Sequence, residues 1–410
     1  EGQDQGQDEG QDEGGALFGA RVAALGRRLP ATHRTTDEVM ASTSHRTRVD
    51  LERLTGIHER RVSVGDEDSF SLALGAARDC VSHWDGNPED IDLVVSCSIT
   101  RYRDGLTQWM EPPLSVALAD AIGASNARTF DLSNACAGML SGVFVANNRI
   151  RTGRARTVLV VSGEYISQLS ANAAKHVHTI ASRELASPTL GDAGAALIIE
   201  RAPAGVEGIS TIGFTTIAEH SRLCLAYPAK HDAGARMFTK SRALQAAAIE
   251  DVPVVLQEIL DTTGLTIDDI DCVIPHQTSA RAIRKGMATV SAALGGEPRQ
   301  PAVVTVDHYG NTASTTHTVA LIEELEAGHL AAGDRVALIA LASGEVIRHP
   351  AKLQRPGDAS TYLSVSVSAA DCTGFQWPCR LFRVEAVGDA VPDPDIPNKR
   401  CLSALRVVEE

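Results

Sequence analysis

Cys136 has the surroundings of a reactive thiol. It lies in DLSNACAG (131–138), where an extended run gives way to a helical pattern that Gly153 can end. A thiol at the first turn of a helix faces free N–H groups and the positive end of the helix dipole, and both favour the nucleophilic thiolate. Small neighbouring residues leave room for a substrate. We therefore interpret Cys136 as a candidate nucleophile, with a buried core cysteine as the alternative.

Two further polar residues could serve such a nucleophile. His276 follows an apolar strand pattern in CVIPHQTSARAI, at the place where parallel strands direct side chains into a ligand crevice. Asn311, in HYGNTAST, occupies a tight turn before a helix, and its amide could donate a hydrogen bond to a developing oxyanion. The alternative for both residues is helix capping. Two other histidines are interpreted as a loop residue and a helix-surface residue, namely His308 and His317.

A layered α/β body is expected to position these residues. Short apolar runs with β-branched residues predict central strands of a largely parallel sheet at 91–98, 157–164 and 336–345. Helical patterns lie between and around these runs, at 70–84, 137–151, 242–262, 279–294 and 312–327. This alternation predicts an α/β fold in which the candidate residues stand where strands give way to helices.

The chain contains a hidden duplication. EDIDLVVS (89–96) reappears as DDIDCVIP (268–275), 179 positions later. The SGE that ends RTVLVVSGE reappears at the end of DRVALIALASGE, 181 positions later. We therefore predict two similar α/β halves, 16–204 and 205–349, packed as one body. The alternative is the general likeness of strands in any α/β protein.

The two ends of the chain differ from this body. Residues 1–15 form an acidic repeat with no apolar side chain, so we expect them to be disordered. Residues 350–410 have Pro-rich ends, and TYLSVSVS within them alternates like an edge strand. We interpret 350–410 as an appendage of unknown role.

The composition argues against several classes of protein. A net charge of −14 disfavours a nucleic-acid-binding surface, which needs a basic patch. No apolar stretch reaches the length of a membrane span, and no signal peptide is evident. Eight scattered cysteines without a C-x-x-C pair predict no metal site or redox motif. These features favour the reducing cytoplasm.

Together, the motifs resemble the thiolase superfamily, and within it the ketoacyl-acyl-carrier-protein synthase III type of condensing enzyme. The stretches that carry the resemblance are LTGIHERRV (54–62), DLSNACAG (131–138), TLGDAGAALII (189–199), IPHQTSARAI (274–283) and HYGNTAST (308–315). The resemblance covers roughly residues 16–349. It implies a five-layer α-β-α-β-α fold built from two duplicated halves, usually as a homodimer.

The resemblance also implies roles for individual residues. A thioester would acylate Cys136, while His276 and Asn311 would polarise the carbonyl of a second thioester or stabilise its enolate. The oxyanion hole for the Cys-bound acyl group would comprise the backbone N–H groups of Cys136 and Gly344. No cofactor is implied beyond the thioester substrates, which are acyl-CoA or acyl carrier protein. In this family Asp192 would be part of a structural turn.

Recognition of CoA is less clear from the sequence. Arg281 matches a family arginine that contacts a CoA phosphate. Asp50 and Leu54 stand where the fatty-acid initiation enzymes have a Trp and an Arg that clamp the adenine. Either CoA is recognised differently in this chain, or the donor is a carrier protein.

Glu111 bears on the type of condensation. It lies between apolar residues in LTQWMEPPLSVAL, and burial there would raise its pKa and make it a better base. The stretch resembles a loop of the OleA-type head-to-head acyl-CoA condensing enzymes, in which a Glu from the partner subunit reaches the Cys pocket. This favours a Claisen condensation without decarboxylation, with Glu111 as base. The alternatives are a decarboxylative synthase that uses malonyl thioesters, an acyltransferase to oxygen or nitrogen acceptors, and a non-catalytic partner subunit. For Glu111 itself, the alternative is a loop carboxylate before a proline turn.

Overall fold

The structure, a computed structural model, describes residues 17–44, 47–206 and 208–340, together with five short strands beyond residue 362. The chain divides into two compact units. The first unit comprises Glu1–Gly213 and Glu219–Glu345, and the second comprises Phe214–Ala218 and Val346–Glu410. The acidic segment 1–15, for which we predicted disorder, lies outside the described residues.

A five-stranded sheet forms the centre of the first unit, in the order β1-β9-β8-β4-β7. Strands β4 (Leu93–Ser96), β7 (Arg128–Asp131) and β8 (Thr157–Glu164) run parallel. Strand β9 (Ala193–Arg201) is antiparallel both to β8 and to β1 (Ala20–Arg28). The sheet is therefore mixed, and the prediction of a largely parallel sheet was wrong for this edge. Strand β9 can pair directly with the preceding strand β8, because an antiparallel neighbour needs no crossover helix.

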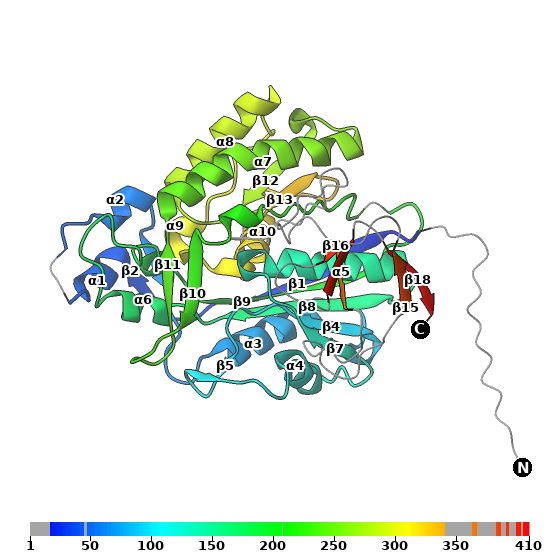
Figure 1. Ribbon diagram of the computed structural model, residues 1–410, viewed down its shortest axis with the longest axis horizontal. Helices are drawn as coiled ribbons and strands as arrows, with labels where there is room; N and C mark the ends of the chain where they lie inside the picture. Colours follow the sequence, from blue (N-terminus) through cyan, green and yellow to red (C-terminus); the bar gives the residue numbers. More distant parts are fainter. Residues whose placement is uncertain are drawn as a thin grey trace, which may run out of the picture. The chain divides into compact units, whose positions relative to one another are not determined.

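Helices cover both faces of this sheet (Figure 1). On one face, α3 (Ser69–Ser82) and α4 (Leu114–Ile122) pack against alternate strand residues, among them Val94 and Leu159. On the other face, α5 (Gly138–Arg151) and α10 (Thr316–Glu326) pack against the residues in between, among them Val95. Successive side chains of a strand point to opposite faces, so each helix layer covers a different set of residues from the same strands, and both sets are buried.

Glycines let α3 approach the sheet closely. A Cβ at Gly163 would lie 2.1 Å from the carbonyl oxygen of Ser69, and one at Gly194 would lie 2.0 Å from that of Leu72. The helix backbone therefore rests directly on strands β8 and β9, and no other residue fits at these two positions without moving the helix.

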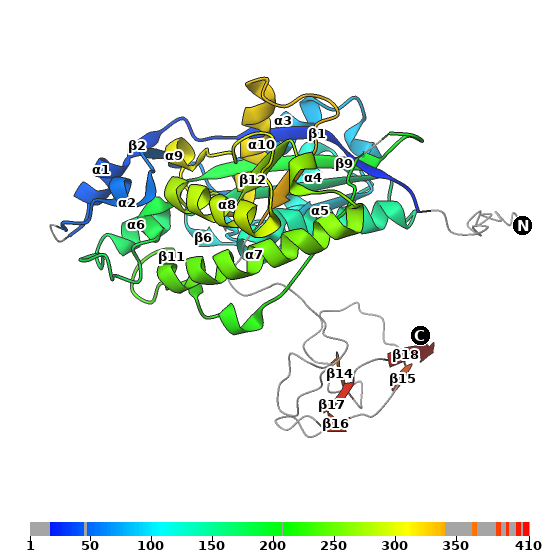
Figure 2. The ribbon, with the colours of Figure 1, turned by 90° about the horizontal axis from the view of Figure 1, so that it is seen from above.

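A second sheet contributes β12 (Cys272–Pro275) and β13 (Val336–Ile339), which pair in parallel. Its outer face packs against α7 (Ser241–Thr263) and α8 (Ala280–Leu294), which lie side by side in Figures 1 and 2. Its inner face packs against α10.

Helix α10 thus lies between the two sheets. Its Val319 belongs to the core of the first sheet, and the adjacent Ala320 belongs to the core of the second. The order from α3 and α4 through both sheets to α7 and α8 is α-β-α-β-α, the five-layer arrangement that we predicted.

The same strand pairing recurs in the two sheets. Leu93 of β4 faces Val158 of β8, and Cys272 of β12 faces Val336 of β13. Leu93 and Cys272 are separated by the predicted 179 positions, but Val158 and Val336 are 178 apart. The offset of 181 positions between the two SGE sequences is therefore three residues larger than the offset between the paired strands β8 and β13. The second SGE lies outside the described residues. The division near residue 205 stays a prediction.

Smaller elements surround the layers. The short helices are α1 (Thr36–Ala41), α2 (Leu51–Thr55), α6 (Gln168–Ala173) and α9 (Val306–Tyr309). Three strand pairs form hairpins or bridges: β2 (His33–Thr35) with β3 (Glu59–Arg61), β5 (Tyr102–Arg103) with β6 (Thr107–Gln108), and β10 (Cys224–Pro228) with β11 (Ala235–Thr239).

The second unit contains the five strands of the C-terminal region. They are β14 (Leu363–Ser366), β15 (Arg383–Ala386), β16 (Val391–Pro392), β17 (Lys399–Leu402) and β18 (Leu405–Glu409). β17 lies between β14 and β16, and β15 pairs with β18. The predicted strand in TYLSVSVS is confirmed as β14, and residues 350–410 all lie in this second unit.

Candidate active site

Cys136 stands between β7 and α5, as we predicted. It occupies the 3₁₀ turn η2 (Ala135–Ala137), which leads directly into α5. Ala135 has φ = 41°, a left-handed conformation that is uncommon for a residue with a side chain. Gly138, just after the turn, would bring a Cβ to 2.9 Å from the carbonyl oxygen of Cys97. The turn that carries the thiol is therefore packed tightly against the end of β4.

Burial governs the acidity of this thiol. Cys136 is half-buried and packs against a cluster of Ile166, Leu169, Leu190 and Ala313. Burial, with smaller contributions from Cys224 and Glu164, raises its pKa to about 12. The hydrogen bond from its own backbone N–H lowers the pKa, but by less. The expectation that the helix N-terminus would favour the thiolate was therefore wrong, because desolvation outweighs it. The resting thiol is protonated at neutral pH.

His276 follows directly after β12 and is buried, with 5% of its surface exposed. Its backbone N–H donates to the carbonyl oxygen of Ile339 (2.8 Å). Burial, together with the neighbouring His317, lowers its pKa to about 3. The imidazole is therefore neutral at physiological pH and can act as a hydrogen-bond donor through one nitrogen.

His317 was missed as a neighbour of the site. It lies in α10, is 2% exposed, and stacks on His276 with 6.0 Å between ring centroids, so its interpretation as a helix-surface residue was wrong. Its Nε2 donates to the same Ile339 carbonyl oxygen (2.9 Å), which leaves Nδ1 as the acceptor. The Nδ1 atoms of both histidines are buried without a hydrogen-bond partner among the described residues.

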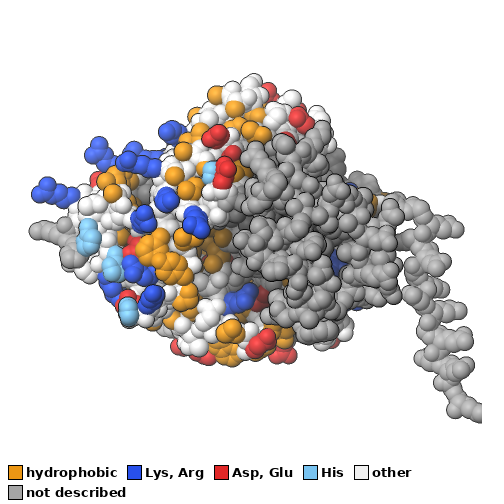
Figure 3. All heavy atoms as spheres, in the orientation of Figure 1, with side chains coloured by type: hydrophobic (Ala, Val, Ile, Leu, Met, Phe, Trp, Pro, Cys, Tyr) orange, Lys and Arg blue, Asp and Glu red, His pale blue; other side chains and the backbone are white. Residues whose placement is uncertain are grey.

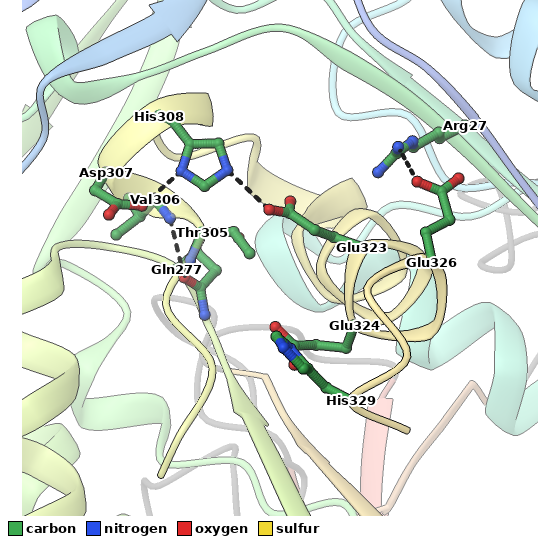
Figure 4. Close-up of polar contacts among 10 residues, drawn as sticks. All are labelled: Arg27, Gln277, Thr305, Val306, Asp307, His308, Glu323, Glu324, Glu326 and His329. Carbon is green, nitrogen blue, oxygen red and sulfur yellow. Dashed lines mark hydrogen bonds and ion pairs between the residues drawn. The ribbon is translucent and has the colours of Figure 1, made fainter. Parts of the chain in front are cut away.

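Gln277 fixes the loop beside His276 (Figure 4). Its Oε1 accepts the backbone N–H groups of Thr305 (2.8 Å) and Val306 (3.1 Å), at the start of α9. Its Nε2 donates to the carbonyl oxygens of Pro275 (2.9 Å) and Val303 (3.0 Å). One buried side-chain amide therefore ties the end of β12 to the segment that leads to Asn311.

A second set of contacts ties α9 to α10. Figure 4 shows His308 between Asp307 and Glu323, at 2.8 Å through Nδ1 and 3.0 Å through Nε2. These carboxylates raise the pKa of His308, most strongly through the hydrogen bond with Glu323. His308 therefore serves to orient α9 on α10, and the described contacts give it no place among the reacting groups.

Asn311 occupies the turn after α9, where Gly310 has φ = 69°. Its backbone N–H donates to Thr189 (2.9 Å), and its carbonyl oxygen accepts from Gly191 (3.0 Å). The side-chain Oδ1 accepts the backbone N–H of Ala313 (2.9 Å). Because Oδ1 is occupied, the side chain is held with Nδ2 as its available donor, as the predicted role requires.

The three candidates meet around the first turn of α10. The turn η2, with Cys136, packs against η6 (Ala313–Thr315), which follows Asn311 and leads into α10. His276 stacks on the second residue of α10. Thus the candidate nucleophile comes from the first half of the chain, and the two candidate donors from the second.

The remaining predicted residues are not part of this cluster in the single chain. Glu111 is exposed on its loop, so the predicted burial of this residue is absent from the single chain, and the adjacent Met110 is 82% exposed. Arg281 is exposed on α8. Gly344 lies outside the described residues.

Sequence reasoning also missed Glu164, the last residue of β8. This carboxyl group is fully buried and accepts hydrogen bonds from the hydroxyl groups of Ser162 and Ser314 and from the N–H of Ile99. Burial raises its pKa to about 7. The sequence showed Glu164 only as part of a repeated SGE, which marks a strand end but says nothing of burial.

The described residues contain no cluster of three or more His, Cys, Asp or Glu that could hold a metal ion. None of the described helices is long and apolar enough to cross a membrane.

Comparison with known families gives matches in both halves of the chain. Residues 130–219 match the family described as 3-oxoacyl-[acyl-carrier-protein] synthase III, and residues 260–348 match its C-terminal part. These ranges include Cys136, His276 and Asn311.

Two named relatives match this chain over more than two thirds of its length. A β-ketoacyl-[acyl-carrier-protein] synthase III of Symbiobacterium thermophilum is 31% identical over 308 residues, which cover 71% of this chain and 85% of that protein. The corresponding enzyme of Erythrobacter litoralis is 26% identical over 332 residues, covering 80% of this chain and 97% of that protein.

Solved structures have the same fold. The priming β-ketosynthase of a polyketide biosynthetic pathway superposes with a TM-score of 0.69 at 26% identity, covering 81% of this chain and 95% of that one. OleA of Xanthomonas campestris superposes with a TM-score of 0.67 at 22% identity, covering 80% and 95%.

Proposed function

This chain belongs to the β-ketoacyl-[acyl-carrier-protein] synthase III family, and we propose that it joins two acyl thioesters into a β-keto product through an acyl group held on Cys136. It is an acyl-transferring condensing enzyme with a thiolase-type fold. The observation that carries the proposal is the packing of the Cys136 turn against the Asn311 turn, with neutral His276 beside them.

In the first half-reaction, the sulfur of Cys136 attacks the thioester carbonyl of the donor. A new carbon–sulfur bond forms, the donor's carbon–sulfur bond breaks, and the proton of the Cys136 thiol leaves with the departing thiol. The oxyanion formed on the way is stabilised by the backbone N–H of Cys136 and, in the family pattern, by that of Gly344. The high pKa of the buried thiol means that transfer of this proton accompanies the attack.

In the second half-reaction, the carbonyl oxygen of the second thioester accepts hydrogen bonds from Nε2 of His276 and Nδ2 of Asn311. These donors stabilise the enolate that forms at its α-carbon. The α-carbon then attacks the acyl group on Cys136, and the thiolate of Cys136 is released. Because burial keeps His276 neutral, its role is to donate a hydrogen bond rather than to supply a positive charge.

We assign removal of the α-proton to Glu111 of a partner subunit. Glu111 and Met110 lie on an exposed loop, and a large apolar side chain that is 82% exposed suits an interface between subunits. Inserted beside the partner's Cys136, Glu111 would take the α-proton and return it to the released thiolate. A homodimer and a cytoplasmic location are part of this proposal.

A second candidate is decarboxylative condensation with a malonyl thioester. One observation favours it: the named relatives are β-ketoacyl-[acyl-carrier-protein] synthases III. Loss of carbon dioxide would supply the enolate without a base.

A basic surface is suited to the phosphate groups of the donor. Arg281, Arg284 and Lys285 are exposed on α8, which packs against α2 with its exposed Arg53. Figure 3 shows Lys and Arg side chains gathered on the side of the molecule where Figure 1 places α1 and α2. Because the whole chain carries a charge of −14, this local concentration favours a phosphorylated ligand such as CoA or a carrier-protein arm. Arg281→Ala should therefore raise KM for the thioester more than it lowers kcat.

The acyl-enzyme step is tested by mass spectrometry after incubation with acyl-CoA. We expect an adduct on the peptide that contains Cys136, and none on the Cys136→Ala variant. Absence of an adduct with both acyl-CoA and acyl carrier protein would favour a non-catalytic partner subunit. An adduct that passes only to oxygen or nitrogen acceptors would favour the acyltransferase alternative.

The source of the enolate is tested with the second substrate. The enzyme is incubated with acyl-CoA alone, and then with added malonyl-CoA or malonyl carrier protein. Product from acyl-CoA alone that disappears in Glu111→Gln, while the Cys136 adduct still forms, supports the base assignment. An obligatory malonyl substrate, or full activity of Glu111→Gln, assigns the decarboxylative route.

A further inference from the structure

Glu164 connects the two halves of the candidate site. It is the last residue of β8, and 0% of its surface is exposed. Its Oε1 accepts hydrogen bonds from the hydroxyls of Ser314 and Ser162 (3.0 Å for Ser162) and lies 3.2 Å from the N–H of Ile99. Ser314 belongs to η6, which begins two residues after Asn311. Glu164 therefore joins the end of β8 to the turn that carries Asn311.

No positive charge accompanies this carboxyl group. Glu164 makes no ion pair with any residue that the structure describes. Glu164 interacts electrostatically with three titratable groups, Asp192, Cys97 and Cys136. Each of these groups is either neutral or negative. Burying an unpaired carboxylate costs several kcal/mol, so such a group tends to bind a proton instead.

A count of protons in the hydrogen-bond network leads to the same conclusion. Ser162 and Ser314 contact each other through their hydroxyl oxygens (2.8 Å), and both contact Oε1 of Glu164. Three oxygen–oxygen contacts need three protons, but two hydroxyl groups supply only two. A proton on Oε1 completes the ring: Oε1 then donates to one serine hydroxyl and accepts from the other, so that each of the three oxygens donates once.

We propose that Glu164 is a positioning residue whose protonated form is the active form of the site. In this form it holds the Asn311 turn through Ser314 and keeps a negative charge away from the Cys136 thiolate. This inference goes beyond the proposed condensation and requires only that Cys136 is the reactive thiol.

The proton on Glu164 should couple the reactivity of Cys136 to pH. Burial raises the pKa of Glu164 to about 7, although the hydrogen bonds from Ser314, Ile99 and Ser162 lower it in part. Below this pH the group is neutral. Above it, the carboxylate raises the pKa of Cys136 and so lowers the fraction of thiolate. The normal gain in thiol reactivity with rising pH is thereby opposed as Glu164 ionises.

The test is the rate at which iodoacetamide alkylates Cys136 between about pH 5.5 and pH 9.5, a range over which a buried thiol stays mostly protonated. Peptide mass spectrometry separates Cys136 from the other cysteines. In the wild-type enzyme, log rate against pH should rise with unit slope, become less steep near neutrality, and then return to unit slope.

Glu164→Gln keeps an uncharged side chain of the same shape. Its plot should be straight, and its rate above pH 8 should exceed that of the wild type by roughly threefold to tenfold, which corresponds to about half a unit to one unit of thiol pKa. The control Glu200→Gln, on β9 and paired with Arg21, should keep the wild-type inflection.

Two results would overturn the proposal: an unchanged inflection in Glu164→Gln, or a rate lowered by one factor at all pH values, which would indicate a structural role alone. If that variant does not fold, Ser162→Ala replaces it. Loss of one hydrogen-bond donor raises the pKa of Glu164, so the inflection should move to higher pH, and an unmoved inflection would refute the idea. Alkylation needs no acyl substrate, so these outcomes are independent of the proposed condensation.

Discussion

Replacing Asp192 with alanine should destabilise the protein strongly. Asp192 is fully buried beside Gly191, whose N–H holds the carbonyl of Asn311. Its carboxylate accepts the backbone N–H groups of Ser63 (2.8 Å), Ile166 (2.8 Å) and Ser167 (2.7 Å), and also the Ser167 hydroxyl (2.6 Å). The contacts bind the segment after β3 and the segment after β8 to the start of β9.

The magnitude follows from the three backbone donors. A buried donor left without its partner costs about 1–3 kcal/mol, so three would cost roughly 3–9 kcal/mol. The variant also loses an unfavourable contribution, because burial raises the pKa of Asp192 despite these hydrogen bonds. We therefore expect the lower end, about 3–4 kcal/mol. At about 2–4 °C per kcal/mol for larger domains, the midpoint of thermal unfolding should fall by roughly 6–16 °C.

The assay is thermal unfolding at pH 7, followed by circular dichroism. Asp232→Ala is the matched control, because Asp232 is partly exposed and its ion pair with Lys175 lies at the surface, where such pairs contribute little. A fall of less than about 2 °C in Asp192→Ala, similar to the control, would refute the account of this carboxylate as a structural tie.

Two further predictions concern the surroundings of His276 and Asn311. Burial lowers the pKa of His317 to about 4, below its usual 6.5. As the pH falls through about 6.5, the unfolded chain binds a proton at this histidine and the folded protein does not. The folded state therefore loses about 2 kcal/mol of stability at pH 5. Between pH 7 and pH 5, the midpoint of thermal unfolding should therefore fall less in His317→Phe than in the wild type. Equal falls in the two proteins would contradict this. A Cβ at Gly191 would lie 2.0 Å from the carbonyl oxygen of Tyr309 and would displace the Asn311 turn. Gly191→Ala should therefore slow condensation by at least about tenfold, while acylation of Cys136 still occurs. The control Gly286→Ala meets no atom within 4 Å in α8 and should leave both steps unchanged, whereas equal losses in the two variants would argue against a role for the turn.

Much of the layered fold could be predicted because its signals are local. The helical patterns at 137–151 and 279–294 correspond to α5 and α8 within one residue at each end. A glycine with positive φ follows the last turn of each, Gly153 and Gly295, and such residues end helices in a way that the sequence shows directly. Cys136 and Asn311 were found for the same reason, since each sits in a short motif of small residues beside a helix.

The missed features depend on contacts between distant parts of the chain. Strand β9 was not predicted as a strand, and its antiparallel direction is fixed by pairing with β1 and β8, which no local pattern reveals. The helix predicted at 312–327 begins as the 3₁₀ turn η6, since Ala313 has φ = 52°. His317 and Glu164 looked ordinary because their states of protonation depend on burial among residues that are distant in the sequence.

The position of α10 has a consequence for folding and for access to the site. Because one helix supplies adjacent side chains to both sheet cores, a polypeptide ending before it would leave an apolar face of each sheet uncovered. Neither half should therefore be recoverable as a separately expressed fragment. The two halves also cannot hinge apart around the candidate site without disrupting both cores at once.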